Sequence, residues 1–218
     1  MIESIPTRGR TLDMASVVYD LLEPLCLLGQ QKKINNHLVS LLDVKSCDKV
    51  LDVGCGTGVL TKLISEKMNP TEGGYSLGID AAGKMISAAR KKRGNTACKF
   101  EAMAAESLSF ENETFDSIVS SFFYHHIQFD LKQKAFAEAY RVLKPGGKLI
   151  IADMHIPTSF MGALTAHTSR WILFQPQIGE NIRGVLPELI ENEGFSYPKT
   201  VENYLGYVTV FSANKGNL

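Results

Sequence analysis

The sequence lacks the features that mark several classes of protein. Its 218 residues carry a formal net charge of +0, so no overall field attracts nucleic acid or an anionic membrane. The longest apolar stretches are far shorter than a membrane span. Arg8 and Arg10 are not followed by the apolar run of a signal peptide. We therefore expect a soluble, cytoplasmic protein with no nucleic-acid partner and no transmembrane segment.

Cysteines are few and are not grouped. Cys26, Cys47, Cys55 and Cys98 form neither a CxxC pair nor a spaced metal cluster, so we predict reduced thiols and no metal site. Internal repeats and low-complexity tracts are also absent. Hydrophobic residues make up 44% of the chain, which is enough to build the core of a single domain of this length.

Short apolar runs alternate with amphipathic stretches through the middle of the chain. The predicted strands are residues 49–53, 75–80, 97–103, 116–122 and 148–153. The predicted helices between them are 57–68, 83–93 and 131–143. This alternation is typical of βαβ units and indicates a parallel sheet with helices on both faces.

The two ends of the chain follow other patterns. Residues 12–28 and 31–42 are predicted to be helical. After residue 153 comes an apolar and aromatic stretch, 158–174, and then a predicted helix, 184–193. Two β-rich runs, 197–203 and 207–213, close the chain with no helix between them. They predict an antiparallel hairpin at the edge of the sheet.

The sharpest motif is a glycine loop between a buried strand and a helix, Val-Leu-Asp-Val-Gly-Cys-Gly-Thr-Gly at residues 50–58. Glycine is needed where the backbone turns tightly and where a ligand approaches it without Cβ atoms. Asp80 ends the next strand, where its carboxylate can accept hydrogen bonds from both hydroxyls of a ribose or cap the following helix. A nicotinamide-binding loop is the alternative, but its GxGxxG/A pattern fails because Val59 occupies the sixth position.

The loop, from Asp52 to Gly58, resembles the first motif of class I S-adenosylmethionine-dependent methyltransferases. Asp80 matches the acidic residue of their second strand. Residues 115–119 resemble their fourth-strand motif, and residues 141–149 are similar to the turn before their fifth strand. Residues 19–22, Tyr-Asp-Leu-Leu, are similar to an N-terminal motif of the ubiquinone and menaquinone biosynthesis branch. The ordered motifs cover residues 49–153, about half the chain.

This resemblance implies the fold. The expected architecture is α/β, a doubly wound Rossmann-like sheet of seven strands in the order 3-2-1-4-5-7-6, with the last strand antiparallel and helices on both faces. We expect a single methyltransferase domain over residues 1–218. Within it, residues 1–45 form N-terminal helices, 46–153 the cofactor-binding half, 154–195 a substrate-side cap and 196–218 the terminal hairpin.

The resemblance also implies S-adenosylmethionine as cofactor, with Asp52 near its ammonium group. The positions that match the family's cofactor contacts are Tyr19, Asp52, Gly54, Cys55, Gly56, Gly58, Asp80, Ala81, Met85, Ala104, Ala105, Glu106 and Ser120. One of them departs from the pattern. Relatives commonly place an Asp that contacts the adenine amino group where this chain has Ala104. Either the backbone at Ala105 reads the adenine alone, or a neighbour such as Glu106 or Ser107 substitutes.

Candidates for contact with the methyl acceptor follow strands four and five. His125 and His126 lie at the carboxyl edge of the sheet, where a histidine can remove a proton at neutral pH, or where the pair only fixes the loop. His155 follows the fifth strand at the same edge. Between residues 160 and 174, Arg170 could meet an anionic group, and Trp171 could line an apolar pocket together with Met161, Leu164, Ile172 and Phe174. Ordinary helix packing is the other interpretation of that stretch.

We therefore predict an S-adenosylmethionine-dependent methyltransferase that acts on a small, partly apolar molecule. An NAD-dependent oxidoreductase and a non-catalytic S-adenosylmethionine-binding module are the alternatives.

Overall fold

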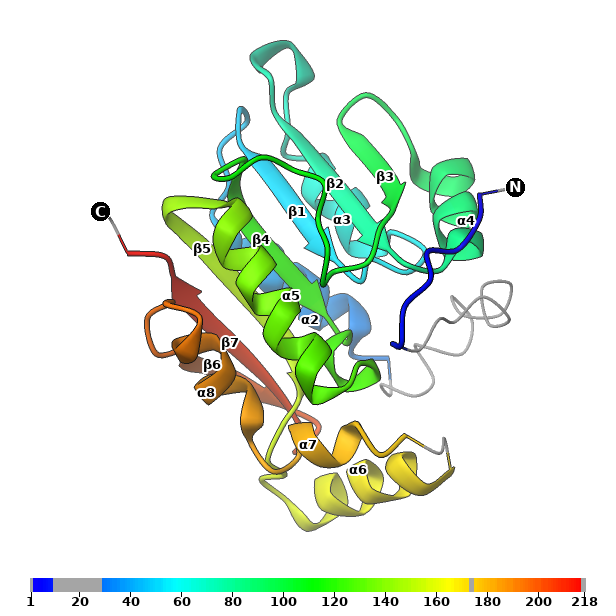
Figure 1. Ribbon diagram of the computed structural model, residues 1–218, viewed down its shortest axis with the longest axis vertical. Helices are drawn as coiled ribbons and strands as arrows, with labels where there is room; N and C mark the ends of the chain where they lie inside the picture. Colours follow the sequence, from blue (N-terminus) through cyan, green and yellow to red (C-terminus); the bar gives the residue numbers. More distant parts are fainter. Residues whose placement is uncertain (1, 10–28, 173–174, 217–218) are drawn as a thin grey trace.

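The computed structural model describes residues 2–9, 29–172 and 175–216. Tyr19 and the predicted helix 12–28 lie outside these residues. Seven strands form one sheet in the order β3-β2-β1-β4-β5-β7-β6 (Figure 1). They are β1 (Lys49–Val53), β2 (Tyr75–Asp80), β3 (Cys98–Ala102), β4 (Phe115–Ser121), β5 (Leu143–Met154), β6 (Lys199–Tyr204) and β7 (Val208–Asn214). The strand order confirms the expected fold. The terminal hairpin is also confirmed, because β7 pairs antiparallel with both β5 and β6.

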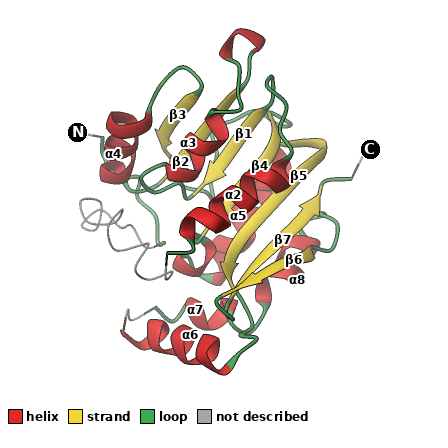
Figure 2. Cartoon of the chain, turned by 180° about the vertical axis from the view of Figure 1, so that it is seen from behind, coloured by secondary structure: helices red, strands yellow, loops and turns green. Residues whose placement is uncertain are grey.

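Helices cover both faces of the sheet. The described helices are α2 (Gln31–Leu42), α3 (Val59–Ser65), α4 (Gly83–Arg93), α5 (Phe129–Val142), α6 (Phe160–Ile172), α7 (Ile178–Asn181) and α8 (Val185–Asn192), with short 3₁₀ turns η2 (Pro70–Glu72) and η3 (Tyr124–His126). One core cluster joins the sheet to α5 and α8, and a second joins its other face to α2 and α3 (Figure 2). Among the described residues, no helix combines the length and apolar character that crossing a membrane requires.

The register of the parallel strands brings their carboxyl ends to one edge. Val53 of β1 pairs with Ile79 of β2 on one side and with Ser120 of β4 on the other. The chain leaves β1 into the glycine loop, leaves β2 just after Asp80 and leaves β4 toward η3. The three connections therefore meet at the same edge, which is where ligands bind in doubly wound sheets.

Strand β5 starts earlier than the sequence predicts. Leu143 already pairs with Phe115, and an irregularity follows before regular pairing resumes between Lys148 and Ser117. The Pro145–Gly147 turn is accommodated inside this stretch, so helix α5 passes into the strand without a separate loop. Proline and two glycines predict a boundary from sequence alone, whereas β4 pairs with the chain on both sides of the turn, at Leu143 and again from Lys148.

Candidate active site

The glycine loop follows β1 and has three residues in the left-handed region, with φ values of 74° at Gly54, 53° at Gly56 and 85° at Gly58. A Cβ atom on Gly54 would lie 2.4 Å from the ring of Phe123, and one on Gly58 would lie 2.3 Å from the ring of Phe100. These two glycines therefore make room for aromatic side chains of the protein. Gly54 also lines both hollows described below, whereas Gly58 lines neither of them.

Asp80 fixes the loop to the start of α4. One of its carboxylate oxygens accepts a hydrogen bond from the backbone N–H of Gly56 at 3.0 Å, and the other accepts from the N–H of Ala82 at 2.8 Å. Ala82 is the residue that precedes α4. Asp80 therefore braces the turn before α4, but the interpretation that it caps the helix is wrong, because the N-cap residue is Ala82 and has no side-chain cap hydrogen bond. A carboxylate has about four lone-pair sites, so this role is compatible with accepting ribose hydroxyls as well.

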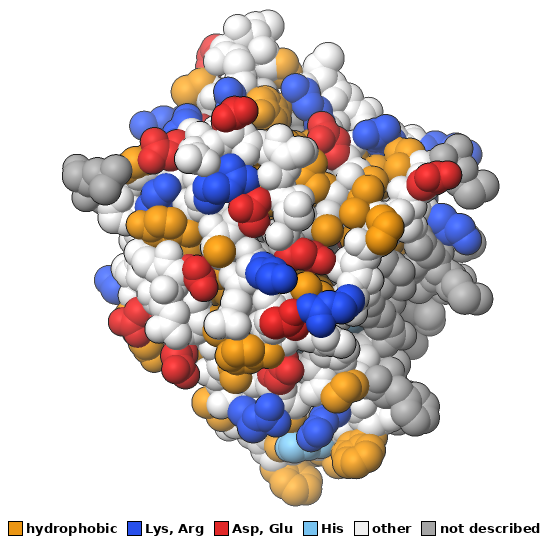
Figure 3. All heavy atoms as spheres, in the orientation of Figure 1, with side chains coloured by type: hydrophobic (Ala, Val, Ile, Leu, Met, Phe, Trp, Pro, Cys, Tyr) orange, Lys and Arg blue, Asp and Glu red, His pale blue; other side chains and the backbone are white. Residues whose placement is uncertain are grey.

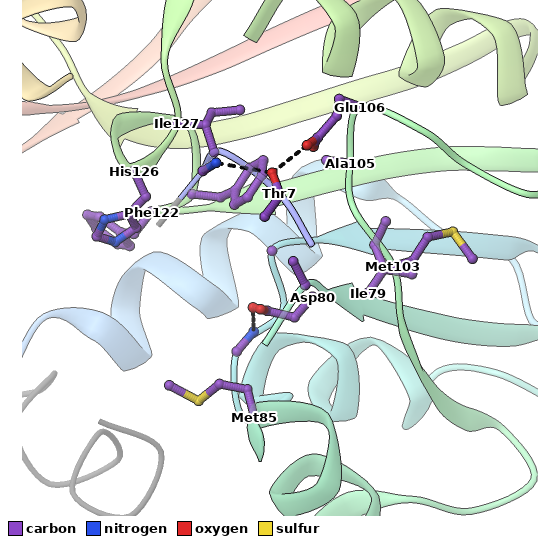
Figure 4. A pocket seen from close by; sticks show the side chains of 15 residues that line it. Thr7, Ile79, Asp80, Met85, Met103, Ala105, Glu106, Phe122, His126 and Ile127 are labelled. Carbon is purple, nitrogen blue, oxygen red and sulfur yellow. Dashed lines mark hydrogen bonds between the residues drawn. The ribbon is translucent and has the colours of Figure 1, made fainter. Parts of the chain in front are cut away.

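A hollow beside Asp80, here called the Asp80 hollow, has a volume of about 630 Å³ including its open mouth. Figure 4 shows its walls. Asp80, Ala81, Met85, Ala105 and Glu106 line it, as the family pattern predicts. Thr7 and Gly9 form a further wall that the sequence motifs do not indicate. Its remaining lining includes the apolar side chains of Met103, Phe122, Phe123 and Ile127.

A second hollow, the Asp52 hollow, lies beside the same loop and has a volume of about 370 Å³. The Asp52 side chain is 1% exposed and accepts a hydrogen bond from the hydroxyl of Thr61 at 2.6 Å. Burial raises the pKa of Asp52 to about 7, with a further rise from the charge of Asp80, while the Thr61 hydrogen bond opposes the shift. The wall also holds two buried polar atoms, Gln31 Oε1 and Ser121 Oγ, that have no partner among the described residues.

The two hollows share Gly54 and Gly56. A molecule lying along the glycine loop can therefore reach Asp80 with one end and Asp52 with the other. The Asp80 end offers a carboxylate and apolar walls, which suit a ribose and a purine. The Asp52 end offers a carboxylate and unpartnered oxygens, which suit a small cationic group.

The histidine pair lies on η3. The Nδ1 atom of His125 is 2.7 Å from Asp153, a fully buried carboxylate at the end of β5. Asp153 also accepts hydrogen bonds from the backbone N–H groups of Tyr124 and Met154, both at 2.7 Å. An ionised carboxylate only accepts, so His125 donates from Nδ1. Sequence reasoning missed this contact. The adjacency of β4 and β5 could have indicated it, because His125 lies just after β4 and Asp153 lies near the end of β5.

The second histidine faces the cleft. His126 lines the Asp80 hollow, and its Nδ1 lies 3.1 Å from the amide oxygen of Gln175. The rings of His125 and His126 are 4.0 Å apart. The buried His125–Asp153 pair therefore holds η3 in place, and His126 is the one of the two that lies beside a ligand in the hollow.

Several predicted contacts lie elsewhere. The hydroxyl of Ser120 donates to the Val53 carbonyl at 2.9 Å inside the sheet, and the next residue, Ser121, lines the Asp52 hollow instead. Neighbouring side chains in a strand point to opposite faces, which explains the displacement by one residue. Cys55 lines the Asp52 hollow, where burial raises the pKa of its thiol well above the usual value. Gly58 and Ala104 line neither hollow, and Ala104 is buried.

The cap candidates do not reach either hollow. Trp171 is 72% exposed, and Arg170 lies over its ring at 5.7 Å. Helix α6 turns its small residues inward, since a Cβ atom on Gly162 would lie 2.1 Å from the Gly206 carbonyl oxygen. Phe160, Met161, Leu164 and Trp171 are exposed, and hydrophobic groups gather at the end of the molecule that α6 occupies (Figure 3). Met161, Leu164 and Trp171 therefore line neither hollow, and their contact with the methyl acceptor stays a prediction; Phe174 lies outside the described residues.

His155 is also apart from the two hollows. Its ring packs edge-on against Phe211, and burial lowers its pKa. The Nδ1 atom is buried and has no partner among the described residues. No group of three or more His, Cys, Asp or Glu side chains suited to a metal ion occurs in the part of the chain that the structure describes.

Comparisons with known proteins agree with this geometry. Residues 51–151 match the family model of the methyltransferase domain. The chain is 34% identical over 146 residues to a ubiquinone/menaquinone biosynthesis C-methyltransferase of Wigglesworthia glossinidia brevipalpis, covering 65% of this chain and 57% of that protein. It is 33% identical to the Marinomonas enzyme of the same name, covering 72% and 65%. The chain thus spans less than two thirds of the length of these curated relatives.

Solved structures show the same fold. A SAM-dependent methyltransferase from Aquifex aeolicus superposes with a TM-score of 0.67 at 20% identity, covering 94% of this chain and all of that one. A phosphoethanolamine N-methyltransferase of Haemonchus contortus, solved with S-adenosylhomocysteine, gives a TM-score of 0.71 at 17% identity, covering 97% and 59%.

Residues 51–151 match the methyltransferase domain, and the strand order and the glycine loop agree with the fold of class I, S-adenosylmethionine-dependent methyltransferases. Within that class, the chain resembles the ubiquinone/menaquinone biosynthesis C-methyltransferases. The residues present fit the cofactor. Asp80 suits its ribose, and Asp52 suits its ammonium group together with the Gln31 and Ser121 oxygens, which have no partner in the described part of the chain.

Proposed function

We propose that this chain is an S-adenosylmethionine-dependent methyltransferase that acts on a small, partly apolar molecule in the cytoplasm. The observation that carries the proposal is the pair of hollows that share Gly54 and Gly56, each with its own carboxylate. A nicotinamide dinucleotide would need an anion site for its pyrophosphate. The Asp52 hollow instead presents a carboxylate, which repels a pyrophosphate.

The substrate class follows from the walls and from the relatives. Met103, Phe122, Phe123 and Ile127 give the Asp80 hollow an apolar side next to His126. Relatives at 30–34% identity are named as ubiquinone/menaquinone and demethylmenaquinone methyltransferases. We infer an aromatic acceptor of the quinol kind, with its ring on the η3 side of the hollow beside His126 and the adenine of the cofactor on the Glu106 side.

The protein's own part in the reaction is orientation and proton transfer. When bound, the cofactor supplies a methyl group on a positively charged sulfur, which keeps the bonding electrons and becomes a neutral thioether. His126 lies where it can take the proton that the acceptor loses, and Gln175 holds its ring by accepting from Nδ1. His125 and Asp153 act through the position of η3.

Calorimetry followed by a substrate screen tests this function. We expect the full chain to bind S-adenosylhomocysteine and S-adenosylmethionine, to bind NAD poorly and to transfer labelled methyl groups to demethylated quinols. Tight NAD binding without S-adenosylmethionine binding would overturn the class. Cofactor binding with no transfer to any aromatic, amine or thiol acceptor would support the non-catalytic binding module instead.

A further inference from the structure

Residues 2–9, here called the N-terminal strap, run beside α4 and pass the carboxyl ends of β1 and β2 (Figure 1). The backbone N–H of Ile5 donates to the carbonyl oxygen of Ala81 at 2.8 Å. The hydroxyl of Ser4 accepts from the N–H of Gly83 at 2.9 Å, at the first residue of α4. The strap is thus hydrogen-bonded to Ala81 and Gly83, which lie between Asp80 and the first turn of α4.

Gly83 shows that this seat is built for the strap. A Cβ atom on Gly83 would lie 2.3 Å from the carbonyl oxygen of Ile2 and 2.6 Å from the carbonyl carbon of Glu3. Glycine costs a helix roughly 1 kcal/mol relative to alanine. Its presence at the start of α4 is explained by the approach of the strap backbone.

The other end of the strap crosses the Asp80 hollow. The hydroxyl of Thr7 donates to the carboxylate of Glu106 and accepts from the N–H of Gly9 at 3.1 Å (Figure 4). A Cβ atom on Gly9 would lie 2.8 Å from the side chain of Ile127, so the strap also reaches the η3 side. It therefore spans the hollow from α4 to the connection after β4.

We propose that the N-terminal strap is the adenosine wall of the cofactor pocket, in which Thr7 positions the Glu106 carboxylate to accept the exocyclic amine of adenine. The proposal rests on the proposed function. Ala104, where relatives carry an Asp, is buried and lines neither hollow. Glu106, two residues further along the same connection, lines the Asp80 hollow and is held there by Thr7.

Two properties follow from this arrangement. The cofactor cannot leave the Asp80 hollow on the strap side without disturbing the Thr7–Glu106 hydrogen bond, so Thr7 slows dissociation. A carboxylate accepts but does not donate when ionised, so Glu106 favours the amino group of adenine over the carbonyl group of hypoxanthine. Glu106 touches the ligand in this scheme, whereas Thr7 is a positioning residue.

Dissociation kinetics test the role of Thr7. S-adenosylhomocysteine is loaded on the full chain and displaced in a stopped-flow experiment. We expect Thr7→Val to dissociate roughly tenfold faster, the size of one hydrogen bond to a charged group, and Thr7→Ser to stay within about twofold of the native chain. Thr71→Val, the same change at an exposed hydroxyl bonded to Asn69, is the matched control. Slower dissociation or tighter binding in Thr7→Val would show that the strap blocks the pocket, and an unchanged rate would show that it is not a wall.

Base selectivity tests the role of Glu106. The affinities of S-adenosylhomocysteine and S-inosylhomocysteine are compared in the native chain and in Glu106→Gln, whose amide can donate to the inosine carbonyl. We expect the preference for the adenosine form to fall roughly tenfold, and Thr7→Val to reduce it partly. Equal losses for both ligands would overturn the assignment of Glu106. A native chain that binds neither ligand contradicts the proposed function, whereas a native chain that binds with unchanged variants contradicts the strap alone.

Discussion

The carboxylates in the two hollows beside the glycine loop differ in exposure and in their hydrogen bonds. Asp80 is partly exposed, and its two oxygens accept backbone hydrogen bonds from Gly56 and Ala82. Asp52 is fully buried, it accepts a hydrogen bond from the hydroxyl of Thr61, and burial raises its pKa to about 7. The protein itself stabilises the charge of Asp80, whereas the charge of Asp52 is costly until a cation lies beside it.

This difference shows that one loop can bind the two ends of a ligand differently, one at a preformed site and one at a site that the ligand completes. The Asp80 side is organised before binding, because backbone N–H groups and the strap fix its geometry. The Asp52 side is completed by the ligand, because the Gln31 and Ser121 oxygens have no partner within residues 2–9, 29–172 and 175–216, and a cation favours the charged form of Asp52. We therefore expect cation binding on the Asp52 side to depend on pH near neutrality.

The largest expected effect is a loss of stability caused by a substitution in the glycine loop that both hollows share. In Gly54→Ala, a new Cβ atom meets the Phe123 ring at 2.4 Å in a backbone region that alanine avoids. Strain of about 1–2 kcal/mol and overpacking of about 1–3 kcal/mol should lower the free energy of unfolding by roughly 3–4 kcal/mol. Gly73→Ala is the control, since Gly73 has a φ of 87° with nothing within 4 Å. Equal losses in urea denaturation would show that Phe123 does not constrain the loop.

The next effect is confined to the Asp80 side. Asp80→Ala removes two charge-assisted hydrogen bonds to ribose and should weaken cofactor binding by roughly 2–3 kcal/mol in calorimetry. Asp80→Asn keeps one acceptor oxygen and should lose about half as much. If both variants bind the cofactor like the native chain while remaining folded, the ribose does not lie at Asp80.

The sequence predicts the residues of the Asp80 hollow better than those of the Asp52 hollow. The strand order, the glycine loop, Asp80, Ala81, Met85, Ala105 and Glu106 follow from motifs that occupy fixed positions after parallel strands. Such positions are fixed by backbone geometry, which a family shares. The sequence cannot show that Gly54 and Gly58 make room for Phe123 and Phe100, because those contacts join residues far apart in the chain.

The remaining misses have the same physical origin. Ser121 replaces Ser120 because the pleat of β4 decides which side chain faces the hollow. The strap has no sequence motif. The local signal that indicates it is Gly83, a glycine at the start of a helix. In the cap, hydrophobic composition predicts a lined pocket, whereas Gly162 and Ala166 turn the small face of α6 inward and leave Trp171 exposed.

The smallest expected effect is the one that depends on pH, and it tests the Asp52 side. Asp52→Asn keeps the shape of the side chain but removes its charge. At pH 8 the variant should bind the cofactor about 1.5–2 kcal/mol more weakly, because a charge-assisted contact to the ammonium group is lost. At pH 5.5 native Asp52 is mostly protonated, so the two chains should bind almost equally. Calorimetry at the two pH values measures the difference.

The stability of the ligand-free chain supplies the check on this prediction, with the opposite sign. Asp52 has a pKa near 3.8 when unfolded and about 7 when folded, so folding takes up a proton between these values. Its contribution to stability is present below the unfolded pKa and is lost as pH rises through 7, at up to about 1.4 kcal/mol per pH unit. Asp52→Asn should remove this slope and make the free chain the more stable one at pH 8, although it binds the cofactor less well. A native chain whose cofactor affinity and stability are both flat from pH 5.5 to 8 would mean that Asp52 is charged throughout, and the two sides of the loop would then not differ as proposed.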